Sequence, residues 1–411
     1  MQNVSQLQRW SKAIPLRSLG DVRHRGLRTP QAPSPEWTQL LEQFAELNPH
    51  PIHLPTLLSY GSPVTSSSVL ISAGYTQAEI ACRLARISHK FDKLPFICGV
   101  NPHISKVHML YRNSFEDLAS VPSVKNEDEN IDFSVQLQRH INLHAHDIPT
   151  LSKGFAECAK YMPTEAITEF LDDLITSRIG VRLIAEQHVS LTETLASAEA
   201  KRENSSKVGV VDLECSPKRM IQMCASFVNS LSDATFGASP PLVIDGIVDA
   251  KFAYIPVHLE YIVTEILKNA VRASVEQHHA IRSTGPLPPV QATIAPSSSF
   301  LSLRIRDQGG GIHSNNLNRI FSYAFTTAGR NAEEADLDWN GDDGPAFFGE
   351  MAGKGLQTGL GTIAGLGYGL PLAKLYANYF GGQLDLRTLH GHGTDVFIKL
   401  RRLGENSAAE I

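Results

Sequence analysis

Residues 265–272 read Glu265-Ile-Leu-Lys268-Asn269-Ala-Val-Arg272, inside a longer run with helical periodicity. The four polar residues are spaced at i, i+3, i+4 and i+7, so they share one face of a helix. An acid, an amide and two bases on one face suit a polyphosphate site. The Asn269 amide oxygen can bind Mg²⁺, and the Glu265 carboxylate can take a proton from a hydroxyl group or water. Because a charged helix face is more often simply solvated, other segments have to agree with this one.

A glycine-rich turn follows a strand pattern nearer the C-terminus. Alternating apolar residues over 301–305 predict a strand, and the chain then reads Asp307-Gln-Gly309-Gly310-Gly311. A carboxylate such as Asp307 at a strand end can accept a hydrogen bond from an exocyclic amine such as that of adenine. Glycines let the backbone turn sharply and approach a ligand closely. By itself the run is equally typical of a plain turn.

Alternate glycines precede a predicted helix over 372–380. This stretch reads Gly365-Leu366-Gly367-Tyr368-Gly369-Leu370. Such glycines leave backbone N–H groups exposed, and the dipole of the following helix favours phosphate at its N-terminus. The pattern is neither the Rossmann G-x-G-x-x-G nor a P-loop, which requires G-K-[ST]. It predicts a phosphate site only in combination with the other segments.

A fourth segment, Gly391-His-Gly-Thr394-Asp, leads into a predicted last strand over 396–400. The Thr394 hydroxyl would lie beside a bound base, although a hairpin turn would have the same composition. The four segments follow one order: asparagine helix, aspartate at a strand end, long loop, G-x-G-x-G and Gly-Thr. That order resembles the Bergerat-type ATP site of the GHKL ATPases, which include histidine kinases, chaperone clamps, type II topoisomerases and mismatch-repair ATPases. The resemblance makes residues 329–362, a stretch too long for an ordinary loop, the ATP lid.

The residues around these segments narrow the resemblance. The helix of Glu265, the residues before the expected lid and the G-x-G-x-G segment resemble mitochondrial pyruvate dehydrogenase kinases and branched-chain 2-oxo-acid dehydrogenase kinases. Two stretches of the N-terminal half resemble the same family, and other GHKL proteins carry unrelated partner domains there. The matching stretches are residues 94–102, 184–193, 259–273, 321–328 and 364–377.

The resemblance implies an ATP-dependent protein serine kinase that phosphorylates and inactivates the dehydrogenase α subunit of a mitochondrial 2-oxo-acid dehydrogenase complex. Glu265 would be the general base and Asn269 would hold Mg²⁺. Lys268 and Arg272 would lie near the phosphates, and Asp307 would recognise adenine. Such a site suits phosphoryl transfer, which needs positioning and charge neutralisation more than covalent help.

The same resemblance implies the rest of the site and the partners. A lipoyl domain of the acyltransferase core would anchor the helical half, and the kinase would be a homodimer. A K⁺ requirement near Phe325 and the Gly365 loop stays open. The further residues implied for the ATP site are Gly309, Gly311, Thr326, Thr327, Gly365, Leu366, Gly367, Tyr368, Gly369, Leu370 and Thr394.

Periodicity and resemblance together predict an α+β protein of two domains, a four-helix bundle followed by a GHKL α/β sandwich. Apolar residues at steps of three and four over 104–118 predict an amphipathic helix behind Asn101-Pro102, whereas the polar run 121–132 predicts a loop. Further strands are expected at 208–211, 242–244 and 291–294. The predicted divisions are a transit peptide and linker (1–35), the lipoyl-binding regulatory bundle (36–203), the ATP-binding domain (208–403) and a tail (404–411).

Composition excludes several other classes of protein. The formal net charge of −5 argues against a general nucleic-acid binder, and no apolar run approaches the ~18 residues of a membrane span. Five scattered cysteines without a C-x-x-C pair argue against structural zinc and a disulfide framework, and favour a reducing compartment. The first thirty residues carry six Lys and Arg residues against the single acid Asp21. This predicts a mitochondrial transit peptide and, with the resemblance, a matrix protein.

Three questions stay open at the level of sequence. A histidine-kinase mechanism would make His188 the phosphoacceptor, whereas the family resemblance makes it a ligand-pocket or structural residue. The target is either the pyruvate or the branched-chain complex: Tyr261, four residues before Glu265, is similar to the branched-chain enzymes, whereas 184–188 is similar to the pyruvate dehydrogenase kinases. A GHKL clamp, or a lipoyl-binding scaffold without kinase activity, is the alternative function.

Overall fold

The computed structural model describes residues 35–197, 206–323 and 367–402. The predicted transit peptide, the lid at 329–362 and the tail at 404–411 lie outside these ranges. The chain divides into two compact units. The helical unit comprises Met1–Ile52 and Thr56–Val210, and the sheet-containing unit comprises His53–Pro55 and Val211–Ile411.

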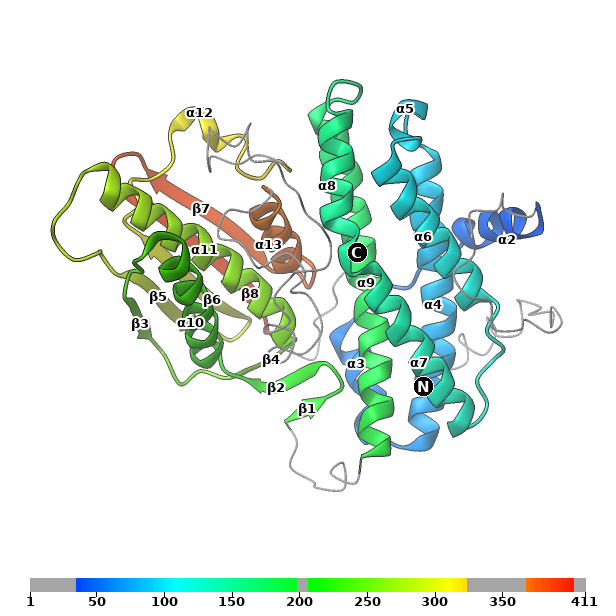
Figure 1. Cartoon of the computed structure of the whole chain (residues 1–411). Coiled ribbons are helices and arrows are strands. Elements are labelled where there is room, and N and C mark those ends of the chain that lie inside the picture. The colour runs from blue at the N-terminus through cyan, green and yellow to red at the C-terminus, as the bar shows by residue number, and fades with distance from the viewer. Residues whose placement is uncertain (1–34, 198–205, 324–366, 403–411) are drawn as a thin grey trace. The chain divides into compact units, whose positions relative to one another are not determined.

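The helical unit is built around four long helical stretches (Figure 1). These are α4, α6, α9 and the stretch in which α7 passes through a short 3₁₀ turn into α8. The helices are α2 (Pro35–Glu46), α3 (Leu54–Ser59), α4 (Ser66–Asp92), α5 (Phe96–Gly99), α6 (Pro102–Ala119), α7 (Glu127–Leu143), η1 (His144–His146), α8 (Asp147–Cys158) and α9 (Thr164–Ala196). The prediction of a helical bundle is therefore confirmed.

Helix α6 illustrates how the sequence specifies this unit. The Asn101 side chain accepts hydrogen bonds from the backbone N–H groups of His103 and Ile104, and Pro102 occupies the first turn. Proline is favoured there because its missing N–H group would have no helical partner. The apolar residues predicted to form one stripe, from Ile104 to Leu118, are buried. The predicted helix and its buried face are both confirmed.

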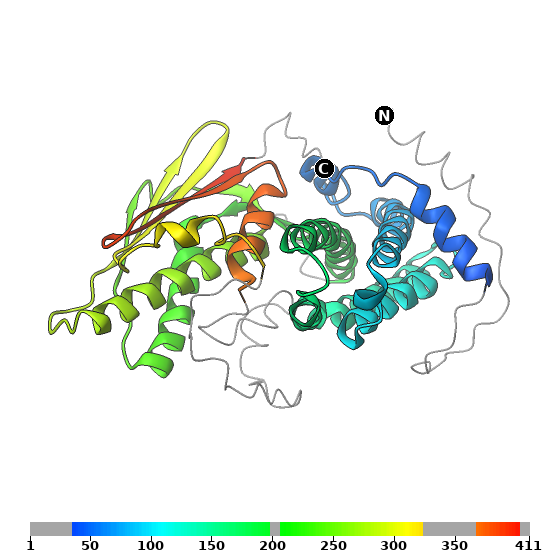
Figure 2. The same cartoon turned by 90° about the horizontal axis from the view of Figure 1, so that it is seen from above.

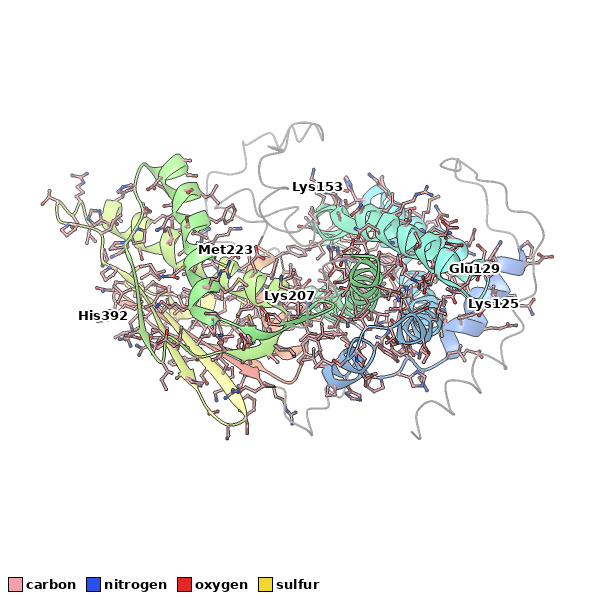
Figure 3. The ribbon with its side chains drawn as sticks, turned by 90° about the horizontal axis from the view of Figure 1, so that it is seen from below. Lys125, Glu129, Lys153, Lys207, Met223 and His392 are labelled. Carbon is pink, nitrogen blue, oxygen red and sulfur yellow. The ribbon has the colours of Figure 1, made fainter. Side chains whose placement is uncertain are left out.

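The loop predicted over 121–132 is too long, because α7 already begins at Glu127. The Asn126 side chain accepts a hydrogen bond from the Glu129 N–H, which caps the helix. The Glu129 carboxylate in turn accepts one from the Lys125 N–H at 2.7 Å. Both residues are labelled in Figure 3. Three acidic residues in the first turn favour the positive end of the helix dipole. The acidic run that suggests a loop is thus a helix N-terminus.

The second unit contains a five-stranded mixed sheet in the order β3-β5-β6-β8-β7. Strands β3 and β5 are parallel, and the other neighbours are antiparallel. Helices α10, α11 and α13 lie on one face of the sheet (Figure 2), and the side chains at 301, 303 and 305 are buried. The predicted α/β sandwich is confirmed. Its elements are α10 (Pro217–Phe236), β3 (Leu242–Gly246), α11 (Pro256–Ala280), β5 (Val290–Pro296), β6 (Phe300–Asp307), α12 (Ser314–Leu317), α13 (Gly369–Asn378), β7 (Gln383–Leu389) and β8 (Gly393–Arg401).

The strand predicted over 208–211 is interrupted. Gly209 has a φ of 60°, so β1 (Lys207–Val208) ends before it and β2 (Val211–Cys215) begins after it. Strand β2 pairs antiparallel with β4 (Phe252–Tyr254), which the sequence did not predict because it is short. Strand β7 was also missed, although it has alternating leucines. These corrections leave the predicted order of helices and strands intact.

The cysteine side chains agree with the prediction from their spacing, which argues against a disulfide framework. Cysteines 82, 98, 158, 215 and 224 are all free thiols in buried positions. In the described ranges, no helix is long and apolar enough to cross a membrane.

Candidate active site

Glu265 and Lys268 lie on α11 and are both buried, with exposed fractions of 7% and 3%. The Lys268 Nζ donates a hydrogen bond to Glu265 Oε1 at 3.2 Å. A buried charge is costly unless it is paired, and each of these side chains provides the other's counter-charge. The interpretation of this run as a solvated helix face is therefore wrong for these two residues.

The start of α13 lies directly against Glu265. A Cβ atom at Gly369 would overlap Glu265 Oε2, so the absence of a side chain at this position lets the start of α13 come this close to the carboxylate. Gly367, two residues earlier, has a φ of 78°. The first and third sequence segments thus meet, and the carboxylate lies beside a helix N-terminus, where backbone N–H groups favour an anion.

The other two polar residues of the α11 run have different environments. Asn269 is exposed, whereas Arg272 is half-buried and its Nε lies 3.6 Å from Glu276 Oε1. The predicted single polar face is therefore divided: Glu265 and Lys268 are buried as a pair, and Asn269 is left open to a ligand.

Asp307 ends β6, as predicted, and is 8% exposed. Its Oδ1 accepts hydrogen bonds from the backbone N–H of Gly309 at 2.8 Å and of Thr394 at 3.2 Å. Burial raises the pKa of Asp307 to about 6, even though the two hydrogen bonds oppose that rise. In the described parts of the chain, no Lys, Arg or His forms an ion pair with this carboxylate. It is a buried acceptor without a cationic partner.

The glycines after Asp307 meet protein atoms. A Cβ atom at Gly309 would overlap Ala273 of α11, and one at Gly311 would overlap the backbone oxygen of Leu389. Gly311 also has a φ of 68°. The sequence predicts that these glycines allow a ligand to approach the backbone. The structure adds a packing reason, because they hold the turn against α11 and the end of β7.

Two residues near the site were missed by sequence reasoning. The Tyr323 ring packs on that of Tyr368, with ring centroids 4.9 Å apart. The Thr388 hydroxyl lies 3.2 Å from that of Thr394. Alternation along β7 is the signal that could have placed Thr388 on the buried face, whereas nothing in the sequence pairs the two tyrosines.

Comparison with known proteins agrees with this geometry. A family model described as mitochondrial branched-chain alpha-ketoacid dehydrogenase kinase matches residues 51–212. A second, described as histidine kinase-, DNA gyrase B- and HSP90-like ATPase, matches residues 254–403. The mitochondrial [pyruvate dehydrogenase (acetyl-transferring)] kinase of Arabidopsis thaliana is 31% identical over 358 residues, which are 86% of this chain and 91% of that protein. Isozyme 4 of the corresponding Rattus norvegicus kinase is 30% identical over 385 residues, 90% of this chain and 85% of that protein.

The chain belongs to the mitochondrial 2-oxo-acid dehydrogenase kinase family. As a member of this kinase family it is a protein serine kinase that uses ATP. The family names associate it with the mitochondrion. The resemblance inferred from sequence is confirmed.

In this dehydrogenase kinase, His188 is completely buried on α9. Its Nδ1 lies 3.1 Å from the Ser72 hydroxyl, and its ring lies 5.5 Å from that of Phe133. Burial lowers the pKa of His188 to about 4. A phosphoacceptor imidazole has to be accessible to a nucleotide, whereas the His188 ring is enclosed by protein side chains. The environment of His188 is therefore that of a structural residue.

Four of the predicted ATP-site residues of the kinase lie outside the described ranges: Thr326, Thr327, Gly365 and Leu366. The described remainder of the G-x-G-x-G segment leads into α13. Tyr368 is buried at the helix N-terminus, and Gly369 and Leu370 form its first turn.

Proposed function

We propose that this kinase phosphorylates a serine of the dehydrogenase α subunit of a mitochondrial 2-oxo-acid dehydrogenase complex and thereby inactivates the complex. Its target is the pyruvate or the branched-chain complex, in the mitochondrial matrix. The named activities of the relatives support this class of target. The observation that carries the proposal is the buried Glu265 carboxylate, held by Lys268 and adjacent to the glycine start of α13.

Glu265 is the general base in this proposal. It accepts the proton of the substrate serine hydroxyl as the serine oxygen bonds to the terminal phosphorus of ATP and the bond from that phosphorus to the departing ADP breaks. The Lys268 ammonium group stabilises the ionised carboxylate and orients it, because its hydrogen bond occupies Oε1. Oε2, which lies next to Gly369, takes no part in that hydrogen bond and is the proposed acceptor of the proton. Such positioning is the main contribution that a protein makes to phosphoryl transfer.

The remaining site residues hold the nucleotide. Asp307 accepts a hydrogen bond from the adenine amine, with Thr394 beside it, and residues 367–370 donate backbone N–H groups to the phosphates. The amide oxygen of the exposed Asn269 suits Mg²⁺, one helical turn from Glu265. The ion neutralises negative charge on the phosphates when it is bound. A K⁺ site near Phe325 and Gly365 would lie outside the described residues.

Partners complete the proposal. The helical unit binds a lipoyl domain of the acyltransferase core, and two copies of the kinase form a homodimer, as the family resemblance implies. The match of residues 51–212 to a dehydrogenase kinase model supports a family-specific role of the helical unit.

The decisive experiment measures transfer of labelled phosphate from ATP to purified pyruvate and branched-chain dehydrogenase α subunits. Glu265→Gln keeps the shape of the side chain and removes the base, so transfer should fall about 10²- to 10⁴-fold while ATP still binds. Glu214→Gln is the matched control in the same unit, because Glu214 is exposed and its Oε2 lies 2.9 Å from Lys251 Nζ at the surface. Labelling of one α subunit that falls in Glu265→Gln would support the proposal and identify the target. ATP hydrolysis without labelling of either α subunit would overturn it in favour of a clamp.

A further inference from the structure

Thr388 extends the nucleotide site across three strands. It is the partner of Thr394 in the β7–β8 register, and Thr394 is the partner of Asp307 in the β6–β8 register. Directly paired residues project from the same face of a sheet. The three side chains therefore form a row, Thr388–Thr394–Asp307, on the face that α11 and α13 cover.

The Thr388 hydroxyl joins three segments of the site. It accepts a hydrogen bond from the backbone N–H of Ile312 at 2.8 Å, beyond the glycine-rich turn. It also lies 3.1 Å from the carbonyl oxygen of Gly393 and 3.2 Å from the hydroxyl of Thr394. The Thr394 N–H in turn donates to Asp307 Oδ1. The turn after β6 and the start of β8 are thus held together through one half-buried hydroxyl.

A hydroxyl group has only one hydrogen to donate, so two arrangements fit these distances. If Thr388 donates its hydrogen to the Gly393 carbonyl oxygen, a hydrogen bond between the two hydroxyl groups requires Thr394 to be its donor. If Thr388 donates to Thr394, the Thr394 hydrogen is directed outwards and can be donated to a ligand. The hydrogen bonding of Thr388 therefore influences whether the Thr394 hydroxyl is a donor or an acceptor towards a ligand, and donation from Thr388 to Thr394 makes it a donor.

This polarity distinguishes purine bases. The relevant edge of adenine has an amine donor next to a ring-nitrogen acceptor. In hypoxanthine and guanine the same edge has a carbonyl acceptor next to an N–H donor. An ionised carboxylate followed by a hydroxyl donor matches adenine at both positions and opposes the other two bases at both, and mismatched buried polar groups are penalised strongly.

We propose that Thr388 is a positioning residue that orients the Thr394 hydroxyl and so contributes to the selection of adenine nucleotides. Thr388 acts through Thr394 and does not itself contact the base. This inference rests on the proposed role of Asp307 and Thr394 in holding adenine.

The test compares ATP and ITP, as direct binding constants and as KM and kcat for phosphate transfer, in the full chain. Thr388→Val keeps the side-chain shape and removes the hydroxyl. We expect it to weaken ATP binding about fivefold to tenfold, the equivalent of one hydrogen bond, to narrow the ATP-to-ITP preference by a similar factor, and to leave kcat within about twofold. Thr388→Ser should restore both values. Thr293→Val, which removes a hydroxyl on β5 bonded to Arg304, is the matched control and should change neither.

Removal of the hydroxyl also leaves the Ile312 N–H without its acceptor, so Thr388→Cys provides a milder variant. Its weakly hydrogen-bonding thiol should narrow the ATP-to-ITP preference by a smaller factor. An unchanged preference in both Thr388→Val and Thr388→Cys, with ATP still bound by the parent chain, would overturn the inference and leave the kinase function intact. A fall in kcat with an unchanged preference would overturn it too, and would make Thr388 purely structural. Failure of the parent chain to bind ATP would remove the proposed function as well.

Discussion

Each unit of the chain has a buried aspartate, and the two have opposite surroundings. In the helical unit, Asp147 Oδ2 lies 2.7 Å from His144 Nδ1 and 3.9 Å from Arg178 Nε. The other ring nitrogen of His144, Nε2, lies 2.9 Å from the Ser114 hydroxyl oxygen. That oxygen in turn lies 3.0 Å from His140 Nδ1. In the sheet-containing unit, Oδ1 of Asp307 accepts two backbone N–H groups and the carboxylate has no cationic partner among the described residues.

The difference distinguishes a structural network from the proposed nucleotide-binding site. The charge of Asp147 is balanced by side chains of its own unit, and its hydrogen bonds stabilise the packing of α6, α8 and α9. Asp307 is buried without such balance, so the pKa of its carboxyl rises to about 6. A buried carboxyl group without a cationic partner among the described residues is a candidate for binding a ligand. The comparison predicts that the helical unit loses stability in acid, whereas the nucleotide site gains it.

The largest expected effect is acid destabilisation of the helical unit. Burial, with a smaller contribution from the His144 and Arg139 charges, lowers the pKa of His140 to about 4, and burial lowers that of His188 to about 4. Both histidines are neutral in the fold. The unfolding free energy should therefore fall as pH drops from 6.5 to 4, by about 3 kcal/mol for each histidine. Hydrogen exchange of α7 and α9 amides at pH 7, 5.5 and 4.5 measures this loss.

A matched variant makes that titration specific. His140→Gln should flatten the pH dependence of exchange in α7, whereas the control His279→Gln, at an exposed position of α11, should leave it unchanged. Equal pH dependence in the parent chain and His140→Gln would contradict the assignment to this histidine.

The next prediction concerns the contact between Gly369 and the Glu265 carboxylate, which spacing along the sequence does not reveal. Gly369→Ala places a methyl group against the Glu265 carboxylate. The base or the start of α13 has to move, and a displacement of about 1 Å costs on the order of 100-fold in transfer rate. Steady-state phosphate transfer measures the loss. Gly74→Ala is the control for adding a methyl group elsewhere, since a Cβ atom at Gly74 in α4 would meet open space. Activity of Gly369→Ala equal to that of the parent chain would contradict the close approach.

The third prediction tests Asp307, the buried aspartate that has no cationic partner among the described residues. The pKa of Asp307 is raised in the fold, so its stabilising contribution is complete below pH 3.8 and is lost as pH rises through about 6. Asp307→Asn removes that penalty. In the nucleotide-free protein at pH 7 it should raise the unfolding free energy of the sheet-containing unit by about 3 kcal/mol, and it should weaken ATP binding.

Thermal unfolding and ATP titration of the same samples measure the two changes. Asp395→Asn is the control, because Asp395 is paired with Arg306 at 2.8 Å. A stability gain in Asp307→Asn with unaltered ATP binding would contradict the role of this residue in recognising the base.

The smallest expected effect is a change in unfolding free energy at the C-terminal end of α11, in the sheet-containing unit. Arg282 follows the last turn with a φ of 50°, a conformation that favours glycine. The Ser283 N–H bonds the His278 carbonyl oxygen at 3.1 Å, which is the pattern of a helix end that usually has glycine at this position. Arg282→Gly should therefore raise the unfolding free energy by about 0.5–1 kcal/mol. Urea unfolding measures it, and a loss of stability would indicate that the Arg282 side chain makes stabilising contacts.

Local chemistry carried the predictions that succeeded. The Asn101-Pro102 start of α6, its apolar stripe and the alternation along β6 each depend on residues close in the chain, so their interpretation did not require the fold. The acidic residues at 127–129 misled because a cluster of charge is common to loops and to helix N-termini. Only the Asn126 hydrogen bond to Glu129 distinguishes the two.

The sequence by itself determined the helical and sheet-containing halves of this protein, its kinase family and the polar and charged residues that are candidates for contacting a nucleotide. Tertiary structure alone decided which of those residues meet. Strand β8 lies between β6 and β7, so Asp307, Thr394 and Thr388 form one row although they are far apart or on different strands. The Glu265 carboxylate meets Gly369 across 104 positions of chain. Spacing along the chain cannot report such contacts, because burial and strand order, set by packing of the whole unit, bring the groups together.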